Sequence, residues 1–157
     1  MDASWNRALR EGLVEGTLAS VLSAGLLALV GRRQAGSAAA PINAVSHWAW
    51  GDESLRQDGL TVKHTLLGFL THHLAATFWA TLHARLWGGR PGGRTVPQAL
   101  VGGLVTSAAA AAIDYTLVPK RLTPGFEHRV SRGAMVGAFG AIALGVAVGA
   151  LLMRERD

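Results

Sequence analysis

Residues 130–153 read VSRGAMVGAFGAIALGVAVGALLM and carry one charged side chain, Arg132, in the first turn. An α-helix needs about 20 predominantly apolar residues to cross the hydrocarbon core of a bilayer. This segment is long enough, and it stops at the charged run Arg154-Glu155-Arg156-Asp157. The stretch therefore predicts a membrane-spanning helix.

Three earlier segments have the same character, at residues 8–30, 62–87 and 96–118. The second is closed by the glycine- and arginine-rich run 88–94, and the third carries Pro97 in its first turn and stops before Pro119. Proline is favourable in the first turn of a helix but cannot continue one. We therefore expect an all-α integral membrane bundle of four transmembrane helices. It forms a single domain over residues 1–157, with an interfacial loop at 32–61.

The composition agrees with a bilayer as the solvent. Of the 157 residues, 50% are hydrophobic and 16% are charged, whereas about a quarter of the residues of a soluble protein are charged. The charges crowd into short segments between the apolar stretches. A water-soluble domain of this length lacks the interior volume to bury four such stretches.

The net charge of +5 does not indicate nucleic acid binding. The Arg and Lys residues sit singly or in pairs at the ends of apolar segments, where a spanning helix meets the lipid headgroups. No basic helix face with interleaved aromatics is present. The chain has no cysteine, which excludes disulfides, thiolate metal sites and cysteine nucleophiles.

Small residues recur four apart along several of the predicted helices. Such rows let helix backbones approach closely inside a membrane. These faces are expected to form either the bundle interior or a seam with a second copy or a membrane protein partner. In the last helix the row comprises Gly133, Gly137, Ala141, Gly145 and Gly149, and in the first it comprises Gly12, Gly16, Ser20 and Ala24.

The loop at 32–61 contains an apolar piece, residues 40–52, that is too short to span and carries Trp48 and Trp50. Tryptophan favours the membrane interface. We expect this piece, with His47 beside Trp48, to lie in the headgroup layer or to dip back towards the bundle.

Ionisable residues inside spanning segments are functional candidates by default, because they are costly unless paired. Glu15 in the first helix, His72 and His73 in the second and Asp114 in the third qualify. One interpretation is a polar cluster that binds a metal, relays protons or holds a polar ligand. The other is a structural pair such as Glu15 with His72. Glu11 is expected to be solvated near the membrane surface. For Asp114, near the end of its helix, the alternative is a contact with Lys120, Arg121 or water.

The segment 114–129 places charged side chains in a compact turn fixed by two prolines and a glycine. One hypothesis is an anion site at the membrane surface for a lipid phosphate or a carboxylate. The alternative is a capped turn whose cations face the headgroups. The charged residues concerned are Lys120, Arg121, Glu127, His128 and Arg129.

No cofactor is predicted. Bis-histidine haem ligation in a bundle needs facing imidazoles from different helices, and only the second predicted helix has histidines in its interior. If a metal binds, His72 and Glu15 are the candidate ligands.

Residues 41–52 (PINAVSHWAWGD), 71–80 (THHLAATFWA) and 114–127 (DYTLVPKRLTPGFE) together resemble small uncharacterised four-helix inner-membrane proteins of Gram-negative bacteria. The resemblance implies a multipass protein of the bacterial inner membrane and brings no activity with it. It also implies that the loop, the histidines and the turn form one site.

The leading functional hypothesis is a non-enzymatic membrane module that binds a lipid or small polar ligand, or assembles with partners. Its expected site joins His47 and Trp48 to His72, His73 and the 114–128 segment. The first alternative is a proton-coupled transporter or channel-like carrier, which requires water at Glu15, His72 and Asp114. The second alternative is a metal- or haem-dependent membrane enzyme.

Overall fold

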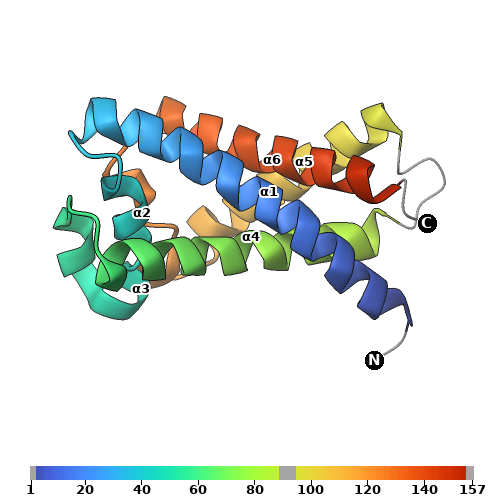
Figure 1. Cartoon of the computed structure of the whole chain (residues 1–157), viewed down its shortest axis with the longest axis horizontal. Helices are drawn as coiled ribbons and strands as arrows, with labels where there is room; N and C mark the ends of the chain where they lie inside the picture. Colours follow the sequence, from blue (N-terminus) through green and yellow to red (C-terminus); the bar gives the residue numbers. More distant parts are fainter. Residues whose placement is uncertain (1–2, 89–94, 155–157) are drawn as a thin grey trace. The chain divides into compact units, whose positions relative to one another are not determined.

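The computed structural model describes residues 3–88 and 95–154, and within them every regular element is helical, with no strand (Figure 1). Four long helices are joined by short helices and turns. The elements are α1 (Ala3–Gln34), α2 (Ala40–Val45), α3 (His47–Trp50), the 3-10 turn η1 (Gly51–Arg56), the π-helical turn η2 (Val62–Leu66), α4 (Leu67–Leu86), α5 (Val96–Thr116), the 3-10 turns η3 (Lys120–Leu122) and η4 (Phe126–His128), and α6 (Arg132–Arg154).

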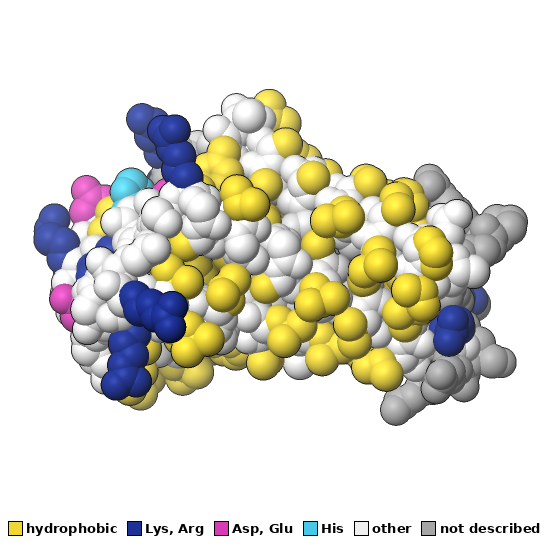
Figure 2. All heavy atoms as spheres, turned by 90° about the horizontal axis from the view of Figure 1, so that it is seen from above, with side chains coloured by type: hydrophobic (Ala, Val, Ile, Leu, Met, Phe, Trp, Pro, Cys, Tyr) yellow, Lys and Arg dark blue, Asp and Glu magenta, His cyan; other side chains and the backbone are white. Residues whose placement is uncertain are grey.

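Three helices in the described part of the chain, α1, α5 and α6, are long and apolar enough to cross a membrane. Only 33%, 28% and 33% of their respective apolar windows are buried inside the protein. Figure 2 shows the result on one face, a broad surface of hydrophobic side chains. Monomeric soluble proteins rarely expose contiguous apolar patches above a few hundred Å², so this pattern is that of a helical membrane protein.

α4 differs from the other long helices because no stretch of it is long and apolar enough to qualify as a candidate span. It is 20 residues long, but it carries His72, His73, His83 and Arg85 and is not among the three candidate spans. Its α-helical part begins at Leu67, after the π-helical turn, rather than at the predicted residue 62.

The other predicted boundaries are close to those observed. α1 extends beyond the predicted 8–30 at both ends, α5 ends two residues before the predicted 118, and α6 begins two residues after the predicted 130. Pro97 lies at the second position of α5, where its missing N–H costs nothing. Of the predicted break at 88–94, residues 89–94 lie outside the described residues.

The chain divides into two compact units. Unit 1 comprises Met1–Leu22, His73–Ala110 and Gly140–Asp157, and unit 2 comprises Ser23–His72 and Ala111–Phe139. α1, α4, α5 and α6 therefore each contribute residues to both units.

Glycines allow the helices of unit 1 to pack backbone against backbone. A Cβ on Gly145 of α6 would collide with the Ala19 backbone of α1, and one on Gly149 would lie 2.6 Å from the Glu15 Cα. Gly12 of α1 meets the Thr81 backbone of α4 in the same way. Part of the predicted small-residue rows therefore forms an interior contact of this chain. A Cβ placed on Gly133 would meet no described atom of another element within 4 Å. An interface there with another chain stays a prediction.

The core of unit 2 forms around the segment that follows α1. Residues 39–47 are buried without exception, which agrees with a piece that dips back towards the bundle. Glycines permit this approach, because a Cβ on Gly31 would lie 2.6 Å from the Pro41 ring and one on Gly68 would collide with the Ile42 carbonyl oxygen. The core cluster comprises Leu27, Ile42, Val45, Phe126, Val130 and Ala138.

Candidate functional site

Unit 2 brings together the two segments that the sequence analysis joined, the loop after α1 and the turn after α5. The Trp48 indole Nε1 donates to the Thr123 carbonyl oxygen over 2.8 Å. The Arg121 guanidinium in turn donates to the Trp48 carbonyl oxygen over 3.4 Å. These contacts join side chains to backbone, so they hold the two segments against each other.

His47 lies at the centre of this junction and is 5% exposed. Its Nδ1 donates to the Ala44 carbonyl oxygen over 2.9 Å, because a carbonyl can only accept. Its Nε2 is buried with no hydrogen-bond partner among the described residues. Gly125 packs against the ring with φ at +90°, and a Cβ there would lie 2.7 Å from the His47 Nδ1.

The two adjacent histidines of α4 each pair with a serine of α1. In unit 2, the His72 Nε2 lies 2.8 Å from the Ser23 hydroxyl oxygen, and the ring meets Phe126 edge-on at 6.5 Å. In unit 1, the His73 Nδ1 lies 2.8 Å from the Ser20 hydroxyl oxygen. The structure thus places His72 against Phe126 of the turn after α5. His73 belongs to unit 1 and pairs with Ser20 of the same unit.

Around the turn after α5, Tyr115 and His128 approach Glu127, whereas Arg121 and Arg129 bond to other segments of unit 2. The Tyr115 hydroxyl donates to the Glu127 carboxylate over 3.4 Å, and the His128 Nε2 lies 3.9 Å from the same carboxylate. Asp114 is half-buried and interacts electrostatically with Glu127. Lys120 is exposed. The turn therefore presents both signs of charge rather than a cationic pocket alone.

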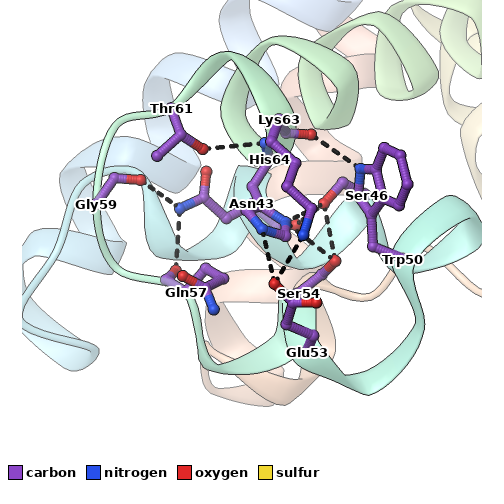
Figure 3. A network of polar contacts seen from close by, with 10 residues as sticks. All are labelled: Asn43, Ser46, Trp50, Glu53, Ser54, Gln57, Gly59, Thr61, Lys63 and His64. Atoms are coloured by element: carbon purple, nitrogen blue, oxygen red, sulfur yellow. Dashed lines mark hydrogen bonds and ion pairs between the residues drawn. The ribbon is translucent and has the colours of Figure 1, made fainter.

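A polar network that the sequence analysis did not identify ties α2 to η1 and η2 (Figure 3). The Ser46 and Ser54 hydroxyl oxygens lie 3.0 Å apart, and each is 3.2 Å from the His64 Nδ1. Asn43 donates from its amide nitrogen to the carbonyl oxygens of Gln57 and Gly59, over 3.0 and 2.9 Å. These residues are far apart in the chain and match no sequence motif, so no local signal marks them.

The outer edge of this network holds an ion pair. The Lys63 ammonium donates to the Glu53 carboxylate over 2.9 Å, and the His64 Nε2 lies 3.5 Å from the same oxygen. The hydrogen bond with Lys63 lowers the pKa of Glu53, and the positive charge adds to the effect.

Serine, imidazole and carboxylate in one network suggest a hydrolase, but the burial argues against one. Ser46 and Ser54 are both 0% exposed. A nucleophile must lie within reach of a substrate carbonyl. The network therefore stabilises the fold of unit 2 and supplies no nucleophile.

Unit 1 contains a carboxylate–imidazole pair. The Glu15 carboxylate oxygen lies 2.8 Å from the His83 Nδ1, and the two side chains are 1% and 2% exposed. The suggested pairing of Glu15 with His72 is wrong, because the turn of α1 that bears Glu15 faces the last turn of α4. Glu11 is also not solvated as expected, since it is 4% exposed and accepts a hydrogen bond from Arg7 over 2.8 Å.

The His83 Nε2 is buried with no hydrogen-bond partner among the described residues. An ionised Glu15 beside a neutral ring leaves Nε2 unprotonated but gives the pair a net negative charge. In an apolar interior such an uncompensated charge costs several kcal/mol. One additional proton removes the charge and leaves an unpaired N–H, which costs about 1–3 kcal/mol.

A pocket of about 490 Å³ lies in unit 2, within the usual range for ligand sites of about 300–1,000 Å³. Most of its wall is apolar, and the small alanine side chains of α1 leave the space open. Three polar residues line it as well. The lining residues are Ala24, Ala28, Ser37, Ala38, Ala39, Ile42, Asp58, Leu60, Thr65 and Phe69. None of the predicted site residues is among them.

The polar lining residues are themselves fixed. The Ser37 hydroxyl donates to the Asp58 carbonyl oxygen over 2.6 Å, and Thr65 donates to the Asn43 side-chain oxygen over 2.6 Å. Asp58 forms an ion pair with Arg129. The pocket thus has an apolar wall and an ordered polar part.

In residues 3–88 and 95–154, no three His, Asp or Glu side chains come together as a metal site. The two suggested metal ligands lie in different environments, Glu15 against His83 and His72 against Ser23. Comparison with known protein families, curated proteins and solved structures finds no match to this chain.

Proposed function

We propose that this chain is a four-span protein of the bacterial inner membrane and that it binds a membrane lipid through the pocket of unit 2. The pocket is the observation that carries the proposal. The location rests on the resemblance of residues 41–52, 71–80 and 114–127 to bacterial inner-membrane proteins.

A contact within unit 2 supports the fourth span. Trp48, before α4, donates to the backbone at Thr123, after α5, so these two segments lie on the same side of a membrane. α4 and α5 together must then cross the membrane an even number of times. If α5, a candidate span, crosses the membrane, α4 crosses as well. Its polar residues are compatible with crossing, since His72 and His83 are buried against neighbouring helices.

A lipid suits the pocket better than a small polar ligand. Ala24 and Ala28 belong to a helix long and apolar enough to span the bilayer, so the occupant meets the pocket from an apolar medium. An acyl chain fits the alanine wall, and Ser37, Thr65 and the paired Asp58 supply polar groups for the region near a headgroup. Burial of methylene groups contributes to lipid attachment in proportion to their number.

Native mass spectrometry of the chain extracted from its own membrane in mild detergent tests this proposal. We expect a stoichiometric extra mass equal to that of a phospholipid. The variant Ala28→Phe fills the pocket and should reduce the bound fraction at least tenfold, which corresponds to about 1.4 kcal/mol. The matched control is Ala108→Phe, an exposed alanine of α5 outside the pocket lining.

A bare chain, or equal loss of lipid in both variants, would contradict lipid binding in this pocket. A bound metal or haem in place of lipid would instead support the enzyme alternative.

A further inference from the structure

A second site is present in unit 1, independent of the lipid pocket. We propose that Glu15 and His83 form a buried proton-binding site in which the pair holds one proton more than an ionised carboxylate beside a neutral imidazole. Its ligand is the proton itself. A site of this kind is what the proton-coupled alternative requires, whereas lipid binding in unit 2 does not depend on it.

Glycines of α5 and α6 pack against the pair at very short range. Gly149 of α6 packs on the Glu15 backbone, with 2.6 Å between a Cβ placed there and the Glu15 Cα. Gly102 of α5 abuts the ring, since a Cβ there would lie 2.6 Å from the His83 Nε2. Any larger residue at these positions would force the helices apart. The glycines therefore build an enclosure around the two ionisable groups.

Few other charges face this enclosure. On α1, Glu11 lies one turn from Glu15 and is bridged by Arg7, while Arg10 is exposed. On α4, Arg85 is exposed and lies over the Trp5 ring at 5.4 Å. The described unit 1 residues of α5 carry no ionisable side chain, and those of α6 carry none before Arg154. Among the described residues of α1 and α4, Arg7 pairs with Glu11 and Arg85 lies over Trp5, so neither of these two cations is directed at the pair.

The protonation state follows from this arrangement. When Glu15 is ionised and His83 is neutral, the His83 Nε2 carries no hydrogen. The pair then has an uncompensated negative charge in an apolar interior. With one more proton, the pair is neutral overall, either as carboxylate with imidazolium or as carboxylic acid with imidazole. The imidazolium places a hydrogen on Nε2, and so does the neutral ring when the carboxylic acid donates to Nδ1; Nε2 is the buried atom without a partner among the described residues. Net neutrality outweighs one unpaired N–H in surroundings of low dielectric constant.

His73 supplies a matched comparison for His83, because its partner is uncharged. His73 also lies on α4 and also reaches a side chain of α1, at the same 2.8 Å distance, but its partner is the Ser20 hydroxyl. A hydroxyl carries no charge and donates or accepts as required. The argument for an additional proton thus applies to His83 and not to His73.

Solid-state NMR on the full chain in lipid vesicles, with ¹⁵N in histidine and ¹³C in the glutamate carboxyl groups, counts the protons on the pair. The His83→Gln and Glu15→Gln spectra assign the resonances. We expect the wild-type pair to keep the additional proton between about pH 5 and about pH 8, the range in which free imidazole titrates. It appears as an imidazolium ring or as a protonated Glu15 carboxyl.

In Glu15→Gln, which removes the carboxylate, residues 15 and 83 together should hold one titratable proton fewer than the wild-type pair. Ser20→Ala, which removes the partner of His73, should leave the count on Glu15 and His83 unchanged. An ionised Glu15 beside a singly protonated ring throughout that pH range would overturn the proposal. The decision rests on the wild-type spectrum, and backbone-to-side-chain correlations in that spectrum assign the resonances if a variant fails to fold.

Discussion

At the residue scale, the buried polar groups are satisfied mainly by hydroxyls and backbone carbonyls. His72 pairs with Ser23 and His73 with Ser20, each over 2.8 Å. Such neutral bonds satisfy both groups without a net charge, and unpaired buried polar groups are costly. The expectation that a carboxylate of α1 meets His72 failed because the facing turns of α1 and α4 are set by backbone contacts, which residue types do not reveal.

Gly125 occupies a position that only glycine fits, and this gives a prediction. Gly125→Ala should destabilise the protein by about 1–3 kcal/mol, because φ is +90° and the new Cβ would lie 2.5 Å from the Ala44 carbonyl oxygen. Thermal unfolding in detergent measures the effect. Gly36→Ala is the control, since Gly36 has φ at +72° in open space. Equal losses in the two variants would show that the close contact contributes nothing.

The Glu53–Lys63 pair predicts a pH dependence of stability. Because Lys63 lowers the pKa of Glu53 in the folded state, the pair stabilises the fold above the ordinary value of 4.5. That stabilisation should disappear as the pH falls through the lower, folded-state pKa. Glu53→Gln and Lys63→Gln should each remove this step from a plot of melting temperature against pH, and the double variant should add nothing. A step that survives in both single variants would contradict the assignment.

At the scale of the elements, close backbone contacts hold the helices together. In α6, Gly145 packs on Ala19 and Gly149 on Glu15, whereas nothing lies within 4 Å of a Cβ on Gly140. In lipid, where no hydrophobic effect acts between helices, such contacts drive association. The four-residue spacing in the sequence predicted close packing for the whole row, as bundle interior or as a seam, and the structure shows such packing within this chain for Gly145 and Gly149. It did not show which members face the protein.

A pair of substitutions within α6 tests this distinction. Gly145→Ala should destabilise the protein by about 1–3 kcal/mol, because the added methyl group meets the Ala19 backbone, which cannot move aside cheaply. Gly140→Ala should be neutral or slightly stabilising, since alanine favours the helix by up to about 1 kcal/mol. Unfolding of both variants in mixed detergent micelles gives the comparison. A loss at Gly140 as large as that at Gly145 would argue against the described packing.

At the scale of the whole molecule, the number of membrane crossings connects the fold to the proposed function. Three helices qualify as spans by length and composition. The crossing of α4 is inferred from the contact between the segments before α4 and after α5. The position of the pocket relative to the bilayer depends on this topology.

Site-directed labelling tests the four-span topology directly, because the chain contains no cysteine. Single cysteines at exposed positions, Asp52→Cys, Lys120→Cys and Thr95→Cys, can be probed with a membrane-impermeant maleimide on intact and opened cells. We expect Asp52→Cys and Lys120→Cys to react from the same side and Thr95→Cys from the opposite side. Labelling of all three from one side would exclude a spanning α4.

By itself, the sequence determined the class of fold. The all-helical class and the apolar helices α1, α5 and α6 are predicted correctly to within a few residues, because length and apolarity are local properties of the chain. The tertiary structure alone decided the pairing of Glu15 with His83, the network of Ser46, Ser54 and His64, and the pocket beside Ala28. These depend on which turn of one helix faces which turn of the next. That register is fixed by short backbone contacts such as Gly145 on Ala19, and a periodic row of small residues permits several registers equally well.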